Sequence, residues 1–151
     1  MKNTLLLALC CLIGFIIQAQ VVQWNFSSKK IADKTYEIHL TATVEEDWHI
    51  YSQATPKGGP LATQIIVTKN PLISLAGKFI EIGRMKIYHD DAFDVDVYAY
   101  TGTVDFVQIV KLKGNPSKSL RTKVNGTVEF MACTKERCLV PEKRSFSISI
   151  Q

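Results

Sequence analysis

Apolar and polar residues alternate with a period of two through much of this chain. Every second residue is apolar in residues 36–44, and the alternation returns in residues 124–132 and 146–150. This pattern is typical of β-strands that bury one face. Apolar and β-branched runs predict further strands at residues 21–27, 48–51, 62–68, 78–82 and 98–106.

Turn-forming residues separate the predicted strands. Gly and Pro mark residues 56–60, 70–71 and 114–116, and no stretch shows a sustained 3.6-residue apolar period. About seven to nine short antiparallel strands predict an all-β fold, an immunoglobulin-like antiparallel β-sandwich. Cys133 and Cys138 are too close in sequence to bridge two facing sheets, so we expect this pair at one end of a hairpin.

The first 19 residues have the pattern of an export signal. Lys2 gives a positive start, and the apolar stretch at residues 5–17 is too short to span a bilayer. We interpret residues 1–19 as a signal peptide and residues 20–151 as one β-sandwich domain. The mature protein is then expected in the periplasm or outside the cell, without stable membrane insertion. Lipidation at Cys10 or an uncleaved anchor is the weaker alternative.

Composition and charge narrow the function. The chain has 151 residues, of which 46% are hydrophobic and 21% charged, as is ordinary for one globular domain. It contains no Gly-rich phosphate-binding motif and no second Cys/His pair at zinc-finger spacing. The net charge of +4 comes from an excess of Lys and Arg in residues 111–151. Without interleaved exposed aromatic residues, this excess does not indicate a nucleic-acid partner.

Metal binding is not expected from the histidines or the acidic residues. His39, His49 and His89 stand apart from one another in the sequence, which favours structural roles. The acidic stretch at residues 90–96 lacks the Gly and the final Glu of a calcium-binding EF-hand loop.

Two cysteines remain once the predicted signal peptide is removed. An isolated pair in an oxidising compartment is normally a disulfide. Closing so short a loop stabilises the fold by only about 2 kcal/mol, and tight, exposed bridges are reduced more readily. Lys135 and Arg137, between the sulfurs, favour a thiolate. These features suit a redox pair, but a lone hairpin disulfide in a secreted β-domain is often a structural cross-link, and both interpretations stay open.

The segment around the cysteines resembles a known family. Ala132-Cys133, followed after four residues by Cys138-Leu139 and then Pro141, is similar to the N-terminal periplasmic domain of the thiol:disulfide interchange protein DsbD. Residues 46–51 resemble the early aromatic strand of that domain, and residues 88–93 resemble its cap loop. The order and separations agree, so the resemblance covers most of residues 20–151. Val140 replaces the first of two prolines that are common in the family.

The resemblance implies roles for individual residues. That domain is immunoglobulin-like and carries electrons from a membrane partner to thioredoxin-like periplasmic proteins. By position, Cys138 becomes the reactive thiol and Cys133 its pairing partner. Phe93 becomes the ring that shields the disulfide, and Asp91 and Tyr51 line the site.

Two functional hypotheses follow. The first is a thiol–disulfide interchange protein with reductase-type chemistry, which needs no cofactor. Since the given sequence stops at residue 151, before the transmembrane and thioredoxin-like domains usual in that family, we expect the membrane electron donor and the thioredoxin-like partners to act in trans. The alternative is a secreted immunoglobulin-like binding or assembly module with an inert structural disulfide. The reduction potential of the disulfide distinguishes the two hypotheses.

Overall fold

The computed structural model describes residues 20–114 and 122–150, so the predicted signal peptide lies outside the described residues. No helix in these ranges is long and apolar enough to cross a membrane. The regular structure consists of strands β1 (Val22–Ala32), β2 (Thr35–Val44), β3 (His49–Tyr51), β4 (Gln64–Val67), β5 (Ile73–Asp90), β6 (Val95–Leu112), β7 (Thr122–Phe130), β8 (Ala132–Cys133) and β9 (Glu142–Ile150). This confirms the all-β class.

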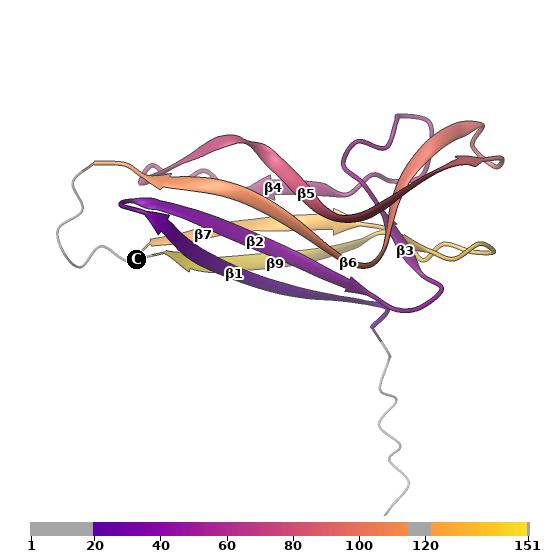
Figure 1. Ribbon diagram of the computed structural model, residues 1–151, viewed down its shortest axis with the longest axis horizontal. Helices are drawn as coiled ribbons and strands as arrows, with labels where there is room; N and C mark the ends of the chain where they lie inside the picture. Colours follow the sequence, from indigo (N-terminus) through magenta and orange to yellow (C-terminus); the bar gives the residue numbers. More distant parts are fainter. Residues whose placement is uncertain (1–19, 115–121, 151) are drawn as a thin grey trace, which may run out of the picture.

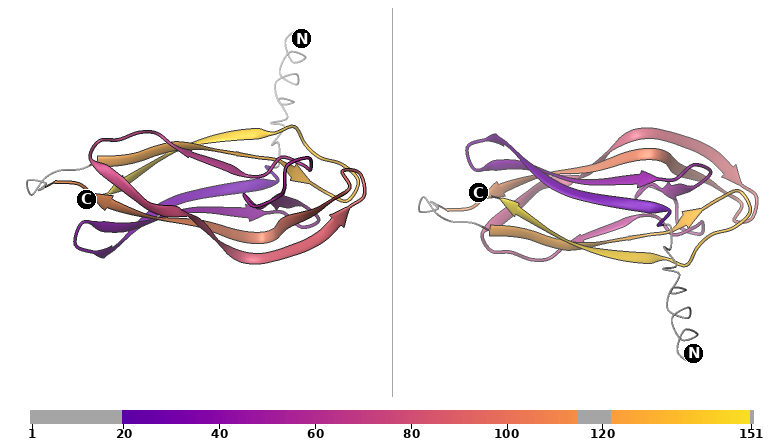
Figure 2. Two further views of the ribbon diagram at one scale, coloured as in Figure 1. Left: turned by 90° about the horizontal axis from the view of Figure 1, so that it is seen from above. Right: turned by 90° about the horizontal axis from the view of Figure 1, so that it is seen from below.

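The strands form two antiparallel sheets that pack face to face (Figure 1). The larger sheet has the order β1-β2-β6-β3-β8, and β5 pairs with the other edge of β6. The smaller sheet has the order β4-β7-β9. The views from above and below show one long sandwich whose strands run along its length (Figure 2). The immunoglobulin-like sandwich predicted from the sequence is therefore confirmed.

Side chains from both inner faces fill the space between the sheets. The predicted alternation in β2 is confirmed, since Ile38, Leu40 and Ala42 are fully buried. The indole ring of Trp24 in β1 lies 5.3 Å from the ring of Phe130 in β7, so aromatic contacts join the two sheets. Each buried apolar side chain of this size contributes about 1.5–3 kcal/mol, and this core fixes the ends of the strands that carry the site.

Two strands are much longer than predicted. β5 and β6 each have 18 residues and form one long hairpin. Most of β5 is exposed, and the strand lies at the edge of the larger sheet, with no second partner strand among the described residues. An exposed strand need not alternate apolar and polar residues, so the sequence pattern predicted a strand only at residues 78–82. Irregularities in the pairing, at Ala76/Ile80 and Gly83/Met85, further obscure the period.

The predicted strand at residues 124–132 is in fact two strands. β7 ends at Phe130 in the smaller sheet, and β8 begins at Ala132 in the larger sheet. The chain therefore crosses between the sheets at Met131. Apolar residues continue through the crossing, so the sequence pattern gave no sign of it. This crossing delivers the first cysteine to the larger sheet, beside β3.

Candidate functional site

The two cysteines form a disulfide within a tight hairpin, as the sequence predicted. Cys133 ends β8 and faces Cys138 in an antiparallel bridge, with their Cα atoms 4.0 Å apart. The Thr134 amide donates a hydrogen bond to the Arg137 carbonyl over 2.8 Å, and the Leu139 amide donates to the Ala132 carbonyl over 2.9 Å. We call residues 133–138 the disulfide hairpin.

The two halves of the disulfide have different environments. Cys133 exposes only 1% of its surface, and it packs in a small cluster with Tyr51, Val97 and Ala99. Cys138 is exposed. The difference follows from the pairing, because β8 is covered on one side by β3 whereas Cys138 lies on the outer side of β8. Only the second cysteine is open to a large partner.

Pairing across β3 and β8 aligns three side chains. His49 of β3 is directly opposite Cys133 of β8, and Cys133 is directly opposite Cys138. Directly opposed residues in an antiparallel ladder project from the same face of the sheet. The neighbouring pair, Ile50 and Ala132, projects from the other face and is buried in the main core. His49, Cys133 and Cys138 therefore form a row on the face away from the main core.

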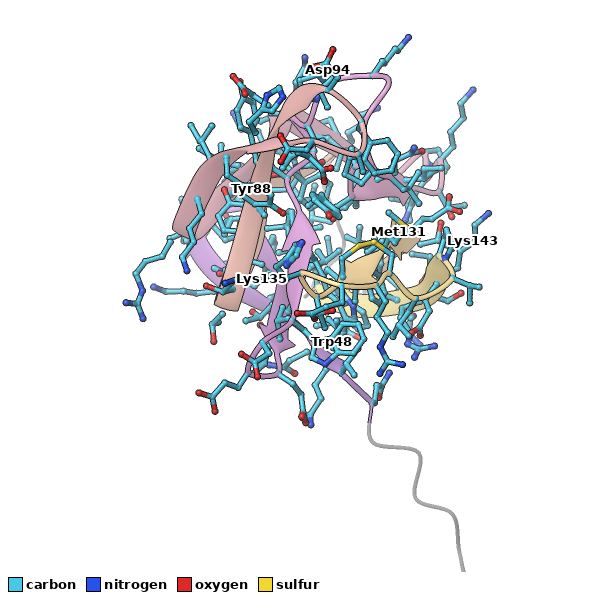
Figure 3. The ribbon with its side chains drawn as sticks, turned by 90° about the vertical axis from the view of Figure 1, so that its right-hand side faces the viewer. Trp48, Tyr88, Asp94, Met131, Lys135 and Lys143 are labelled. Carbon is cyan, nitrogen blue, oxygen red and sulfur yellow. A yellow bond between two sulfur atoms is a disulfide. The ribbon has the colours of Figure 1, made fainter. Side chains whose placement is uncertain are left out.

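A broad open cleft of about 1640 Å³ lies at this end of the sandwich. Three segments form it: the turn between β2 and β3, the tip of the β5–β6 hairpin and the disulfide hairpin. Figure 3 looks at this end and labels Trp48, Tyr88 and Lys135, one residue from each segment. Of the residues predicted from the resemblance, four line the cleft: Tyr51, Asp91, Phe93 and Cys138. Cys133, the fifth, is the buried partner of Cys138.

Phe93 and Asp91 lie in the turn that joins β5 to β6. The Asp94 amide donates to the Asp90 carbonyl over 2.8 Å, and the Ala92 amide donates to a carboxylate oxygen of Asp90 over 3.0 Å. Phe93 leaves 43% of its surface exposed. The ring of Phe93 therefore lines the cleft and is not buried in the core. Its role in shielding the disulfide stays a prediction.

His49 joins two tyrosines across the cleft. Its Nε2 atom lies 3.1 Å from the hydroxyl of Tyr51 and 3.0 Å from the hydroxyl of Tyr88 in β5. Burial lowers the pKa of His49 and is the largest influence on it. The nearby Asp90 carboxylate raises this pKa by a smaller amount, and Lys86 lowers it. Burial also raises the pKa of both tyrosines. All three side chains are therefore neutral near pH 7.

The sequence does not single out His49 or Tyr88 as a candidate site residue, although both line the cleft. His49 was expected to be isolated and structural, whereas it contacts both tyrosines. The spacing of His49 and Tyr51 could have revealed this contact, because residues i and i+2 of a strand share a face. Tyr88 begins the stretch 88–93 that resembles the cap loop, but its contact with His49 had no signal in the sequence, since it depends on how β5 pairs with β6.

A basic residue stacks on an aromatic ring at the edge of the cleft. The guanidinium of Arg137 lies 5.5 Å from the ring centre of Trp48, just before β3. This cation–π contact ties the disulfide hairpin to the β2–β3 turn. It also holds a positive charge on the residue next to Cys138, where positive charge favours a thiolate.

His89 also has partners that the sequence did not predict. Its ring nitrogens lie 3.4 Å from Asp94 and 3.1 Å from Asp96, across the hairpin turn. The hydrogen bond with Asp96 raises the pKa of His89. Within residues 20–114 and 122–150, no group of three or more His, Cys, Asp or Glu side chains is arranged to hold a metal ion.

Several solved structures match this chain at low sequence identity. The N-terminal periplasmic domain of ScsB from Proteus mirabilis matches with 17% identity and a TM-score of 0.49, over 85% of this chain and 44% of that chain. The yeast GGA1 GAE domain matches with 10% identity and a TM-score of 0.43, over 90% of this chain and 96% of that chain. BcpA, the major pilin subunit of Bacillus cereus, matches with 11% identity and a TM-score of 0.40, over 85% of this chain and 39% of that chain.

The chain spans less than half of the ScsB structure that it matches. No curated protein sequence matches it significantly. The family described as "Thiol:disulfide interchange protein DsbD, N-terminal" matches residues 16–150, which is nearly the whole sequence. The chain belongs to the family of the N-terminal domain of the thiol:disulfide interchange protein DsbD.

Proposed function

We propose that this protein passes reducing equivalents between redox partners through the Cys133–Cys138 dithiol and disulfide. The observation that carries the proposal is the unequal exposure of the two cysteines. Cys138 lines an open cleft while Cys133 is 99% covered, so a partner's sulfur has a single point of approach. A structural cross-link needs no cleft beside it, whereas an exchange site needs room for a partner. Family membership supports the same function.

The exchange proceeds in two steps. In the reduced protein, the Cys138 thiolate attacks one sulfur of a partner's disulfide, which forms a mixed disulfide and releases one partner thiolate. The Cys133 thiol then loses its proton, and its sulfur attacks Cys138. This second step breaks the mixed disulfide and releases the second partner thiolate. Two thiols of this protein are oxidised to one disulfide, and one disulfide of the partner is reduced to two thiols.

The partners are proteins rather than small molecules. The cleft is wide and open, and it is bordered by charged residues of both signs, which suits the surface of a folded partner. We assign thioredoxin-like proteins as electron acceptors and a membrane protein as electron donor, both acting in trans. The domain works in the periplasm, after removal of residues 1–19.

The reduction potential of the disulfide tests the proposal. The protein is equilibrated with glutathione buffers of graded potential, and the fraction of oxidised protein is measured after acid quenching and alkylation. An exchange disulfide is expected to have a potential above about −300 mV. A lower potential would identify a structural cross-link and favour the alternative of a binding or assembly module.

Alkylation of the reduced protein tests the roles of the two cysteines. Brief treatment with iodoacetamide near pH 7, followed by peptide mapping, is expected to label Cys138 before Cys133, because Cys138 is exposed. The variants Cys133→Ser and Cys138→Ser provide the single-thiol references. Faster labelling of Cys133 would reverse the assigned roles.

A further inference from the structure

The second step of the proposed exchange poses a chemical problem at Cys133. This thiol must lose its proton before its sulfur can attack Cys138. Only 1% of Cys133 is exposed, and it packs with the apolar Val97 and Ala99 and with Tyr51, whose hydroxyl contacts His49. Burial disfavours the charged thiolate, and bulk water has little access to take the proton. A nearby base would remove this obstacle.

His49 is the side chain placed to act as that base. It is directly opposite Cys133 in the β3–β8 ladder, and such pairs hold their Cβ atoms roughly 4.5–5.5 Å apart. Sγ is one bond from the cysteine Cβ, and Nδ1 is two bonds from the histidine Cβ, so these atoms can approach each other. The hydroxyls of Tyr51 and Tyr88 engage Nε2, on the far side of the ring.

We propose that the neutral imidazole of His49 accepts the proton of Cys133 when Cys133 resolves the mixed disulfide. His49 is then the general base of the second step, and this role rests on the proposed function. The proton passes from Cys133 Sγ to Nδ1, and the sulfur keeps the electron pair with which it attacks Cys138. The imidazolium returns the proton to the partner thiolate that the step releases. No further reactant is needed.

The charged and titratable groups around His49 suit this role. From β5, Asp90 stabilises the imidazolium while Lys86 opposes it, and Tyr88 contacts the ring directly. From β3, Tyr51 contacts the ring. The β2–β3 turn brings Glu45, Glu46 and Asp47 to the cleft, and the disulfide hairpin brings Lys135, Glu136 and Arg137. Burial keeps the ring neutral between turnovers, as a base requires.

A stopped-flow reaction with dipyridyl disulfide separates the two steps. One equivalent of this reagent reacts with the reduced full-length mature chain. Attack by Cys138 releases the first thiopyridone, and attack by Cys133 on the mixed disulfide releases the second. The first phase reports the proposed function, and the second phase reports the role of His49. The Cys133→Ser variant, which gives only the first phase, assigns the two signals.

The informative variant is His49→Gln, which keeps a polar side chain for the tyrosine contacts. At pH 7 we expect the second phase to slow at least about tenfold, since general bases typically contribute 10²–10⁴-fold. The first phase should stay within about twofold of the wild-type rate. The matched control is His39→Gln, because His39 bonds to Asp105 in the middle of the sheet and does not line the cleft. It should leave both phases unchanged.

The pH dependence of the wild-type protein gives an independent readout. Burial lowers the pKa of His49, so the second phase should lose rate as the pH falls through this lowered pKa, where the ring becomes protonated. The His49→Gln variant should lack this loss of second-phase rate at low pH. Equal second-phase rates in wild type and His49→Gln would overturn the role of His49. If His49→Gln does not fold, the wild-type protein provides the test. A wild-type second phase whose rate does not fall at low pH would overturn the role of His49. Absence of the first phase would overturn the proposed function itself.

Discussion

Phe93 differs from the phenylalanines of the sandwich core in its exposure. Phe106 and Phe130 are almost completely buried, whereas Phe93 leaves 43% of its surface open beside the disulfide hairpin. An aromatic ring that stabilises the fold little is suited to control access to a reactive sulfur. The family resemblance predicts this shielding role, and the position of Phe93 in the cleft permits a direct test.

We predict that Phe93→Ala speeds reduction of the disulfide by dithiothreitol by about threefold or more, because a wall of the cleft is removed. The free energy of unfolding should fall by about 1 kcal/mol or less, in contrast with the 3–5 kcal/mol typical of buried phenylalanines. Reduction kinetics and urea unfolding are measured on the same variant. Val140→Ala is the matched control, since Val140 is 81% exposed just after the hairpin. An unchanged rate of reduction would contradict shielding.

At the level of single residues, the sequence could predict part of the site. The cysteine spacing indicated the disulfide, and the resemblance indicated Tyr51, Asp91 and Phe93. The difference in burial between the cysteines could not be predicted, because it depends on which strand lies beside β8. The same holds for the contact between His49 and Tyr88, which come from strands that do not pair with each other.

At the level of elements, one carboxylate connects β5 to the end of β3. Glu81 accepts hydrogen bonds from the hydroxyls of Ser52 and Tyr100, at 2.6 and 2.9 Å. It also accepts bonds from the backbone amide and the side-chain amide of Gln53, at 2.8 and 3.1 Å. Ser52 and Gln53 directly follow Tyr51. Three of these bonds therefore hold the segment that follows Tyr51 against the long hairpin, and the fourth, from Tyr100, joins β6 to β5 within the hairpin.

Replacement of this carboxylate tests its importance. Glu81→Gln places an amide NH₂ among groups that are themselves donors, so some bonds are lost while the shape is kept. We predict a decrease of about 2 kcal/mol in the free energy of unfolding, because charge-assisted bonds are worth roughly 1.5–3 kcal/mol. Urea unfolding followed by circular dichroism gives the value. Glu46→Gln, on the exposed β2–β3 turn, should change stability by less than about 0.5 kcal/mol. Equal stability of the two variants would show that Glu81 does not hold this segment.

The strand pattern explains which elements could be predicted. Strands such as β2 and β9 bury one regular face against the opposite sheet, and their alternation was visible in the sequence. β5 is exposed along most of its length, so its sequence does not need an apolar residue at every second position. The crossing at Met131 lies between two buried residues, Phe130 and Ala132. Continuous burial therefore concealed the change of sheet.

At the level of the whole molecule, the site occupies one end of the sandwich. The β2–β3 turn, the β5–β6 turn and the disulfide hairpin lie far apart in the sequence but meet at this end (Figure 1). The other end carries the β1–β2 turn and the end of β9 (Figure 1). The fold class could be predicted from alternation alone, but the meeting of these segments depends on the order of strands in the larger sheet.

The exposure of Cys138 and the burial of Cys133 have a consequence for steady-state kinetics. In the proposed exchange, the electron donor and the electron acceptor both reach Cys138 through the same cleft, so the two partners cannot be bound at once. Each partner leaves before the other arrives, which is a ping-pong scheme. With a reduced and an oxidised thioredoxin-like protein as the two substrates, double-reciprocal plots at several fixed concentrations of one substrate should be parallel. Intersecting lines would require a complex of three proteins and therefore a second docking surface elsewhere on the sandwich.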